Sequence, residues 1–264
     1  MGYDAGLMPR DIQALLATSV FGRRLYYTNE VDSTNRVAKE FARAGEPDGT
    51  VVIADFQTAG RGRRERQWVS PRGTNLLFSL ILKPDKTALG VLPITMALSL
   101  GIAETLTRRL GIDVGVKWPN DVIAAKGKLC GVLSESATRA GRVSFVIVGI
   151  GINVNMKREQ FPAGVPAASC FSITGTIHDR KQVLADVLHA LETIHAEFLR
   201  EGFPALLERY IRRLVLMDKP ITFRRGPDVG QGEVIGVQPD GALVVRTDGG
   251  SSVTLYDEEV EFST

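Results

Sequence analysis

The sequence has few of the residues that mark several common classes of protein. It contains only two cysteines and three histidines in 264 residues. Cys130 and Cys170 lie far apart and neither belongs to a CxxC pair, which predicts reduced, buried thiols in a cytoplasmic protein and no disulfide framework. His178, His189 and His195 lack the i, i+4 spacing of a zinc-binding helix. We therefore expect surface histidines and no histidine metal site.

Strong net charge and long apolar runs are also missing. The net charge of +2 is too small to indicate nucleic-acid binding by bulk electrostatics. Residues 1–10 do not have the basic-then-apolar pattern of a signal peptide. The longest apolar stretch, 88–106, is interrupted by proline and glutamate and predicts a buried helix, so we expect no membrane association. With 44% hydrophobic and 23% charged residues, the chain has an ordinary globular composition.

The hydrophobic pattern predicts a large α+β domain over residues 1–215 and a small β domain over 216–264. This division rests on the periodicity of apolar residues and on the positions of turn residues. In the first domain, strands are expected at 25–28, 50–56, 75–82, 114–117, 121–125, 128–135 and 143–154, with helices at 11–17 (capped by Asp11), 33–45, 89–110, 183–199 and 204–214. In the second, short alternating strands at 221–223, 233–237, 242–246 and 252–256 predict an SH3-like or OB-like barrel.

A run of arginines and glycines follows the expected strand at 50–56. It reads Gly60-Arg61-Gly62-Arg63-Arg64-Glu65-Arg66-Gln67-Trp68, with Gln57 just upstream, and we call residues 60–68 the arginine loop. Glycines allow a backbone to approach a ligand closely, and arginines match phosphate and carboxylate geometry. The tryptophan could cover a flat ring. The alternative is a solvated basic turn.

A second polar segment interrupts an expected strand. In Lys117-Trp118-Pro119-Asn120-Asp121, proline cannot continue a central ladder. Asn120 and Asp121 are therefore expected at a strand break, where side chains can face a ligand. The alternative is a turn with a capping aspartate.

Two further segments combine apolar strands with glycine. Lys128 begins an apolar strand that contains Gly131, so it is either the exposed start of that strand or a charge directed into a pocket. Gly149 and Gly151 alternate on another strand and leave a bare patch on one face. The alternative is a strand packed tightly against a helix, and GxG alone is weak evidence of nucleotide binding.

Taken in order, these segments resemble the motifs of biotin protein ligases. The similar segments are Asp32-Ser33-Thr34-Asn35, 57–64 with Trp68, 117–121, 128–131 and 149–153. The resemblance implies a mixed β-sheet packed with helices, of the class II aminoacyl-tRNA synthetase and biotin ligase type, followed by a small SH3-like barrel.

The resemblance also implies an activity. Such enzymes join biotin to ATP, with Mg²⁺, to give biotinyl-5′-AMP and pyrophosphate, and then pass the biotinyl group to one lysine of a biotin carboxyl carrier protein. It implies that Lys128 lies between the biotin carboxylate and the α-phosphate, while Arg61 and Arg63 hold the adenylate. Asp121 is a candidate for Mg²⁺ binding and for orienting the acceptor lysine.

The residues implied in each role overlap. The catalytic set is Lys128, Arg63 and Asp121. The biotin set is Ser33, Thr34, Asn35, Gln57, Gly60, Arg61, Arg63, Lys128 and Gly131. The ATP and adenylate set is Arg61, Arg63, Arg64, Trp68, Asn120, Lys128 and Asn153.

The chain departs from the family at Glu65, which stands where a third loop glycine is usual. Glu65 could hold the loop through Arg64 or Arg66, or point to solvent. About thirty residues precede Val31, so we expect a monofunctional ligase without a DNA-binding domain. The resemblance allows a homodimer through a sheet edge. The alternatives are a lipoate or octanoate ligase or transferase of the same superfamily, and a non-enzymatic nucleic-acid-binding barrel that uses Arg224 and Arg225.

Overall fold

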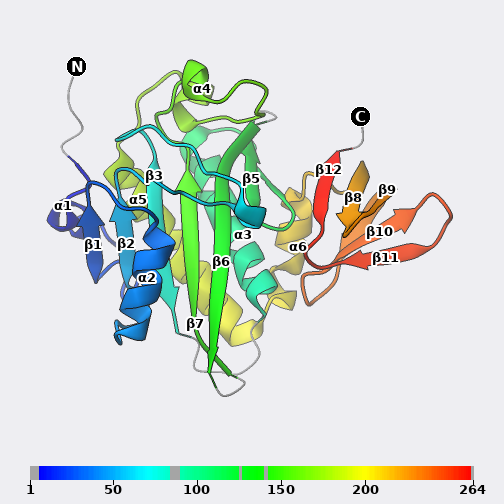
Figure 1. Ribbon diagram of the computed structural model, residues 1–264, viewed down its shortest axis with the longest axis horizontal. Helices are drawn as coiled ribbons and strands as arrows, with labels where there is room; N and C mark the ends of the chain where they lie inside the picture. The colour runs from blue at the N-terminus through cyan, green and yellow to red at the C-terminus, as the bar shows by residue number, and fades with distance from the viewer. Residues whose placement is uncertain (1–5, 84–89, 125–126, 140–141, 263–264) are drawn as a thin grey trace.

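The computed structural model describes residues 6–83, 90–124, 127–139 and 142–262. The expected helix start at Leu89 and strand end at Ala125 lie outside these ranges. The larger part of the chain forms a seven-stranded mixed sheet in the order β1-β2-β3-β7-β6-β5-β4 (Figure 1). Its strands are β1 (Leu25–Thr28), β2 (Val51–Ala54), β3 (Leu76–Leu82), β4 (Gly115–Lys117), β5 (Asp121–Ala124), β6 (Gly127–Arg139) and β7 (Arg142–Ile152).

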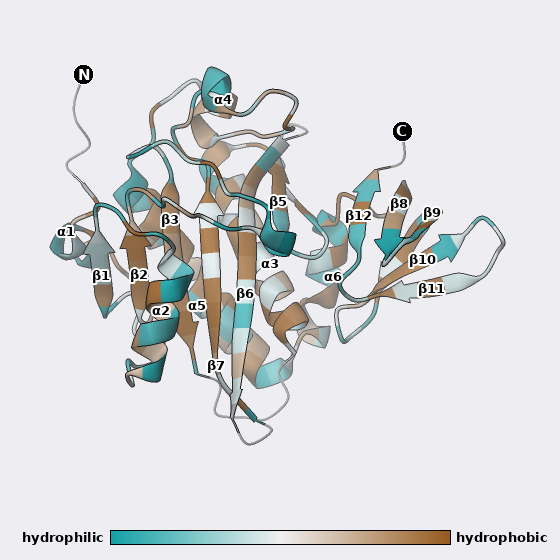
Figure 2. Cartoon of the chain, viewed as in Figure 1, coloured by the Kyte–Doolittle hydropathy of each residue, from teal (hydrophilic) through white to brown (hydrophobic). Residues whose placement is uncertain are grey.

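Strands β2 and β3 are buried on both faces of the sheet. Every residue of β2 and β3 is buried, as expected of continuous apolar runs at the centre of a sheet. Both strands are mostly brown in Figure 2. Strands β1 and β2 pair in parallel, whereas the other pairs of this sheet are antiparallel. The predicted mixed sheet is confirmed.

Helices cover the two faces of the sheet unequally. The long helices α3 (Val91–Leu110) and α5 (Arg180–Glu201) pack against each other on one face, and α2 (Thr34–Arg43) covers β2, β3 and β7 on the other (Figure 1). Helix α3 ends at Gly111, whose left-handed φ of 66° favours glycine. The remaining helices are α1 (Pro9–Gln13), α4 (Cys170–Thr174), α6 (Pro204–Arg213) and the 3₁₀ turns η1 (Arg63–Glu65) and η2 (Arg158–Gln160).

Two local expectations were wrong. Helix α1 begins at Pro9 after Met8, so Asp11 lies in its first turn and does not cap it. His195 is not on the surface: its side chain is buried on α5, with its ring 5.5 Å from that of Phe21. No helix in the described part of the chain is long and apolar enough to cross a membrane.

A separate antiparallel sheet follows α6. Its order is β11-β10-β9-β8-β12, with β8 (Pro220–Arg225), β9 (Asp228–Val237), β10 (Leu243–Thr247), β11 (Ser252–Leu255) and β12 (Glu259–Phe262). Within residues 216–262 its end strands, β11 and β12, are not paired with each other, so the sheet is not closed there, although it is consistent with an SH3-like domain. It contacts α6 through β9, and Trp118 Nε1, in the turn between β4 and β5, donates to the Gly241 carbonyl at 2.9 Å.

Candidate active site

One cavity of about 540 Å³ gathers almost all of the predicted site residues. It lies over β5, β6 and β7 and is bordered by the N-terminus of α2, the arginine loop, residues 161–167 and β12. Thirteen of the predicted residues line it: Ser33, Thr34, Asn35, Gln57, Arg61, Arg63, Arg64, Trp68, Asn120, Asp121, Lys128, Gly131 and Asn153. Gly60 is buried behind it, where an added Cβ would lie 2.9 Å from the Trp68 carbonyl oxygen.

The glycines of β6 and β7 leave room for the Trp68 ring. Gly131 and Gly151 are directly paired across the two strands. A Cβ on Gly151 would lie 2.6 Å from the Trp68 ring, and one on Gly131 would lie 3.0 Å from it. The indole therefore rests on Gly151, one of the two glycines of the predicted bare patch, whereas the other, Gly149, packs against Asn35 of α2, as the alternative interpretation expects. Its Nε1 is buried and has no hydrogen-bond partner in the described residues.

Cations meet at one end of this floor. Lys128 Nζ lies 2.7 Å from Asp121 Oδ1 and 5.4 Å from the centroid of the Trp68 ring. Lys117, at the end of β4, also lines the cavity. Burial lowers the pKa of Lys117, while the Asp121 carboxylate opposes that shift. The sequence pattern did not single out Lys117, although it begins the segment that contains Asn120 and Asp121.

Three arginines of the arginine loop contact the second sheet, while Trp68 of the same loop rests on the floor. Arg63 donates to Asn120 Oδ1 at 3.3 Å and to the Asp257 carbonyl at 3.0 Å, and it forms an ion pair with the Asp257 carboxylate. Arg64 donates to the same carbonyl at 2.6 Å. Arg66 pairs with Glu259 of β12. The second sheet thus supplies acidic partners to the loop.

Glu65 takes no part in these ion pairs. Its side chain is exposed, and no contact with Arg64 or Arg66 is found in the described residues. Of the two alternatives, Glu65 therefore points to solvent. Its φ of 60° and the φ of 54° at Arg64 are left-handed, a conformation that costs a non-glycine residue roughly 1–2 kcal/mol.

A chain of polar side chains runs along the opposite end of the cavity. Gln57 Oε1 accepts from the Thr34 backbone N–H at 2.7 Å and lies 3.1 Å from Thr34 Oγ1. The Ser79 hydroxyl on β3 lies 2.8 Å from Thr34 Oγ1 and 2.6 Å from Asn35 Oδ1. Asn35 Nδ2 donates to Glu135 Oε2 at 2.8 Å. Neither Ser79 nor Glu135 was predicted from the sequence.

Asn153 is fixed by backbone groups and by Asn75. Its Nδ2 donates to the carbonyls of Lys128 and Ala168 at 3.2 and 3.1 Å, and its Oδ1 accepts from Asn75 Nδ2 at 3.3 Å. Asn153 therefore holds the backbone of Lys128. Its predicted contact with the nucleotide remains a prediction.

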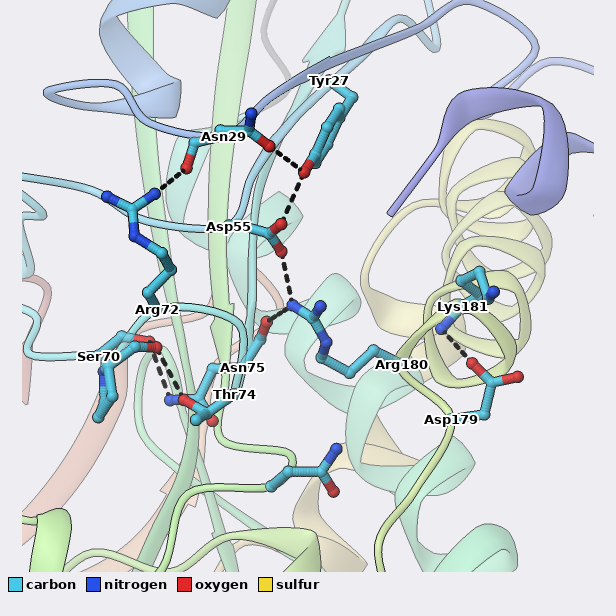
Figure 3. A network of polar contacts seen from close by, with 12 residues as sticks. Tyr27, Asn29, Asp55, Ser70, Arg72, Thr74, Asn75, Asp179, Arg180 and Lys181 are labelled. Carbon is cyan, nitrogen blue, oxygen red and sulfur yellow. Dashed lines mark hydrogen bonds and ion pairs between the residues drawn. The ribbon is translucent and has the colours of Figure 1, made fainter. Parts of the chain in front are cut away.

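A buried network behind the floor holds Asn75 in turn (Figure 3). Arg180 Nη1 lies 2.8 Å from Asp55 Oδ1 and donates to the Asn75 carbonyl at 3.1 Å. Asn75 Nδ2 also donates to Ser70 Oγ at 3.0 Å, just beyond the arginine loop. The Tyr27 hydroxyl donates to Asp55 at 2.6 Å, and burial together with that carboxylate raises the pKa of Tyr27 to about 12.

The carboxylates that line this cavity are not clustered in the described residues. Within the described ranges, no three His, Cys, Asp or Glu side chains are grouped so that they could hold a metal ion. Asp121 is the predicted residue with a suitable carboxylate, and its buried Oδ1 faces Lys128.

Comparison with known proteins agrees with this arrangement. Residues 27–153 match the model of the Biotin/lipoate A/B protein ligase family. The bifunctional ligase/repressor BirA of Bacillus subtilis is 31% identical over 257 residues, which is 97% of this chain and 79% of that protein. The biotin–[acetyl-CoA-carboxylase] ligase of Paracoccus denitrificans is 32% identical over 84% of this chain and 94% of its own length.

A solved structure is similar over nearly the same length. The biotin protein ligase from Aquifex aeolicus in complex with biotin and ATP has 29% identity and a TM-score of 0.80, covering 91% of this chain and 100% of that chain. Together with the ordered motifs around one cavity, these similarities show that the chain belongs to the biotin protein ligase family.

Proposed function

We propose that this chain is a biotin–[biotin carboxyl-carrier protein] ligase. It joins biotin to ATP as biotinyl-5′-AMP, releases pyrophosphate, and transfers the biotinyl group to a lysine of a biotin carboxyl carrier protein. The observation that carries this proposal is one cavity with hydrogen-bonding side chains at one end and cations at the other. Ligand sites of this size commonly combine an apolar wall with a few placed polar groups.

The first step requires electrostatic help more than a general base. A carboxylate is already ionised at neutral pH, and it attacks the α-phosphorus while the bond from that phosphorus to the pyrophosphate oxygen breaks. Two anionic groups must approach each other, so preorganised cations lower the barrier. Lys128 lies on the cavity floor, and Lys117 lines the same cavity. We assign Lys128 to the carboxylate and the α-phosphate.

The arginine loop serves the nucleotide in this proposal. Arg61, Arg63 and Arg64 border the cavity, and their guanidinium groups match phosphate oxygens. Asn120 accepts from Arg63 and so orients it. Trp68 covers the glycine floor and, with the loop, excludes water from the mixed anhydride.

The second step needs a neutral acceptor amine, because a lysine has an ordinary pKa of about 10.4. Asp121 is our candidate for orienting that amine, since it lies beside Lys128. Mg²⁺ would enter with the phosphates of ATP, with Asp121 as the one carboxylate ligand proposed. Such an ion usually keeps few protein ligands, which fits a single carboxylate.

We also propose a domain division, a cellular location and an oligomeric state. Residues 1–215 form the catalytic domain and 216–264 the small β domain. A cytoplasmic location is supported by the two cysteines, which are free and buried. A homodimer through a sheet edge remains part of the proposal.

A lipoate or octanoate ligase is less favoured. Its acyl substrate has no ureido group to use the polar end of the cavity. The similar enzymes of Paracoccus denitrificans and Aquifex aeolicus are both named for biotin.

The direct test is incubation of the wild-type protein with biotin, ATP and Mg²⁺. Pyrophosphate release and a mass-spectrometric signal of biotinyl-AMP are expected, followed by biotinylation of an added carrier domain. Thermal shifts with biotin and with lipoate distinguish the two acyl substrates. A protein that forms no adenylate with biotin would refute the proposal.

Lys128→Ala tests the assigned role. We expect adenylate formation to fall roughly 10²–10³-fold, because a preorganised charge next to the developing phosphoryl charge is lost. Lys219→Ala is the matched control, since Lys219 is exposed and outside the cavity. Near-normal adenylation by Lys128→Ala would show that the role is wrong.

A further inference from the structure

At the far end of the cavity, a polar chain of hydrogen-bonded side chains joins Glu135, Asn35, Ser79 and Thr34. The donor and the acceptor of each bond in this chain can be assigned. A carboxylate accepts hydrogen bonds and does not donate them, so the group of Asn35 that faces Glu135 must be its amide nitrogen. The same nitrogen faces the Leu133 carbonyl at 3.4 Å. Asn35 Oδ1 is therefore turned toward Ser79, which is fully buried.

The orientation of the Asn35 amide also sets which groups donate in the hydrogen bonds between Asn35, Ser79 and Thr34. Because Asn35 Oδ1 accepts at 2.6 Å, the single hydroxyl proton of Ser79 is used there. The lone pairs of Ser79 Oγ then face Thr34 at 2.8 Å. The Thr34 hydroxyl donates either to Ser79 or to Gln57 Oε1, and its own lone pairs remain for the cavity.

The side-chain amide of Gln57 turns its oxygen toward Thr34 and its nitrogen away from it. Its Oε1 faces a backbone N–H of Thr34, which can only donate. The amide Nε2 of Gln57 is therefore the donor directed away from Thr34, and it has no hydrogen-bond partner in the described residues. Thr34 thus offers an acceptor at this end of the cavity, while Gln57 Nε2 lies beside Gly60, where an added Cβ would be 3.2 Å from it. The acceptor complements a ligand that carries an N–H.

We propose that Glu135 is a specificity-determining positioning residue. It fixes Asn35, Ser79 and Thr34 in the direction that makes Thr34 Oγ1 an acceptor for a ureido N–H. The inference rests on the proposed function and deepens it, because it gives a reason to select a cyclic urea over an acyl chain that has no N–H. Glu135 acts through three side chains and is not a catalytic residue.

Glu135→Gln is the informative substitution. The shape is kept, but the new amide can present either its oxygen or its nitrogen to Asn35, so the direction of the chain is no longer fixed. We expect the dissociation constant for biotin to rise about tenfold, the worth of one good hydrogen bond. The dissociation constant for ATP and the melting temperature should stay unchanged. Isothermal titration calorimetry measures both ligands without requiring turnover.

Two further measurements separate this role from simple structural damage. Ser79→Ala cuts the chain between Thr34 and Asn35, so Glu135→Gln should have little further effect on biotin binding in that background. A biotin analogue with a ureido N–H replaced by CH₂ should lose affinity for the wild type and lose much less for Glu135→Gln. Glu208→Gln, the same change on an exposed part of α6, is the control.

The outcomes are distinguishable. A wild-type protein that does not bind biotin refutes the proposed function itself. A wild type that binds biotin, with Glu135→Gln binding it equally well, overturns the role of Glu135. Fully additive losses from Ser79→Ala and Glu135→Gln would also overturn it, because independent residues do not share a relay.

Discussion

Replacing Gly149 by alanine tests whether Asn35 is held in one position. Gly149 lies in β7 between Ser79 of β3 and Leu133 of β6. Its φ is not left-handed, so an alanine meets no backbone strain. The added methyl would, however, lie 2.2 Å from Asn35 Oδ1 and 2.8 Å from its Cγ. Contacts this short require Asn35 to move.

The cost follows from what Asn35 would lose. Asn35 is 5% exposed, and its side chain is hydrogen-bonded to both Ser79 and Glu135. Overpacking alone costs roughly 1–3 kcal/mol, and a lost hydrogen bond adds about 1 kcal/mol. We expect Gly149→Ala to lower the free energy of unfolding by about 3 kcal/mol, which denaturant titration measures. Biotin affinity should fall at least about tenfold, because the polar chain is displaced.

Gly236→Ala is the matched control. Gly236 also lies in a strand without left-handed φ, and an added Cβ there meets no atom within 4 Å. Its unfolding free energy should change by less than about 0.5 kcal/mol. If Gly149→Ala were as stable as this control and bound biotin normally, Asn35 would not be fixed as described.

Two other predictions concern the arginine loop and a buried histidine. Glu65→Gly should not destabilise the protein, because glycine accepts the left-handed φ of 60°, whereas Glu65→Val should cost about 1 kcal/mol in the same denaturant titration. Burial lowers the pKa of His195 from 6.5, with Asp48 opposing the shift, so the unfolded chain takes up this proton first and stability falls as the pH drops below about 6.5. His195→Gln should reduce that loss between pH 7 and 5, while the exposed His189→Gln should not; equal pH profiles for the two variants would contradict this account.

Most strands were predicted within a few residues because local sequence determines them. The runs at β2 and β3 are mostly apolar and fully buried, so their length, their apolar composition and the turn residues around them indicate strands without knowledge of the fold. Strand β12 was not predicted. Its residues alternate Glu259, Val260, Glu261 and Phe262, and what makes them a strand is pairing with β8, such as Glu259 opposite Arg224. That partner is distant in sequence.

Some residues of the site were also predictable from local sequence, whereas others depend on the tertiary fold. Glycine, arginine and lysine motifs predicted where a ligand could bind, because their composition is unusual for a core. Ser79 and Glu135 were missed because each is a single polar residue in a mostly apolar strand. Their contacts with Asn35 join residues 44 and 100 positions apart. Such a pairing exists only after β3, β6 and α2 have been brought together.

The ion pairs between the arginine loop and the acidic residues of the second sheet are weak enough to be replaced by contacts with a ligand. Asp257, which contacts Arg63 and Arg64, has a side chain that is 88% exposed. Ion pairs with such exposure contribute about 0–1 kcal/mol each. Bidentate contacts between arginine and phosphate are stronger, and a water-excluded cavity strengthens them further. The second sheet can therefore orient the loop without ligand, and under the proposed role of the loop the nucleotide phosphates would compete successfully for its arginines.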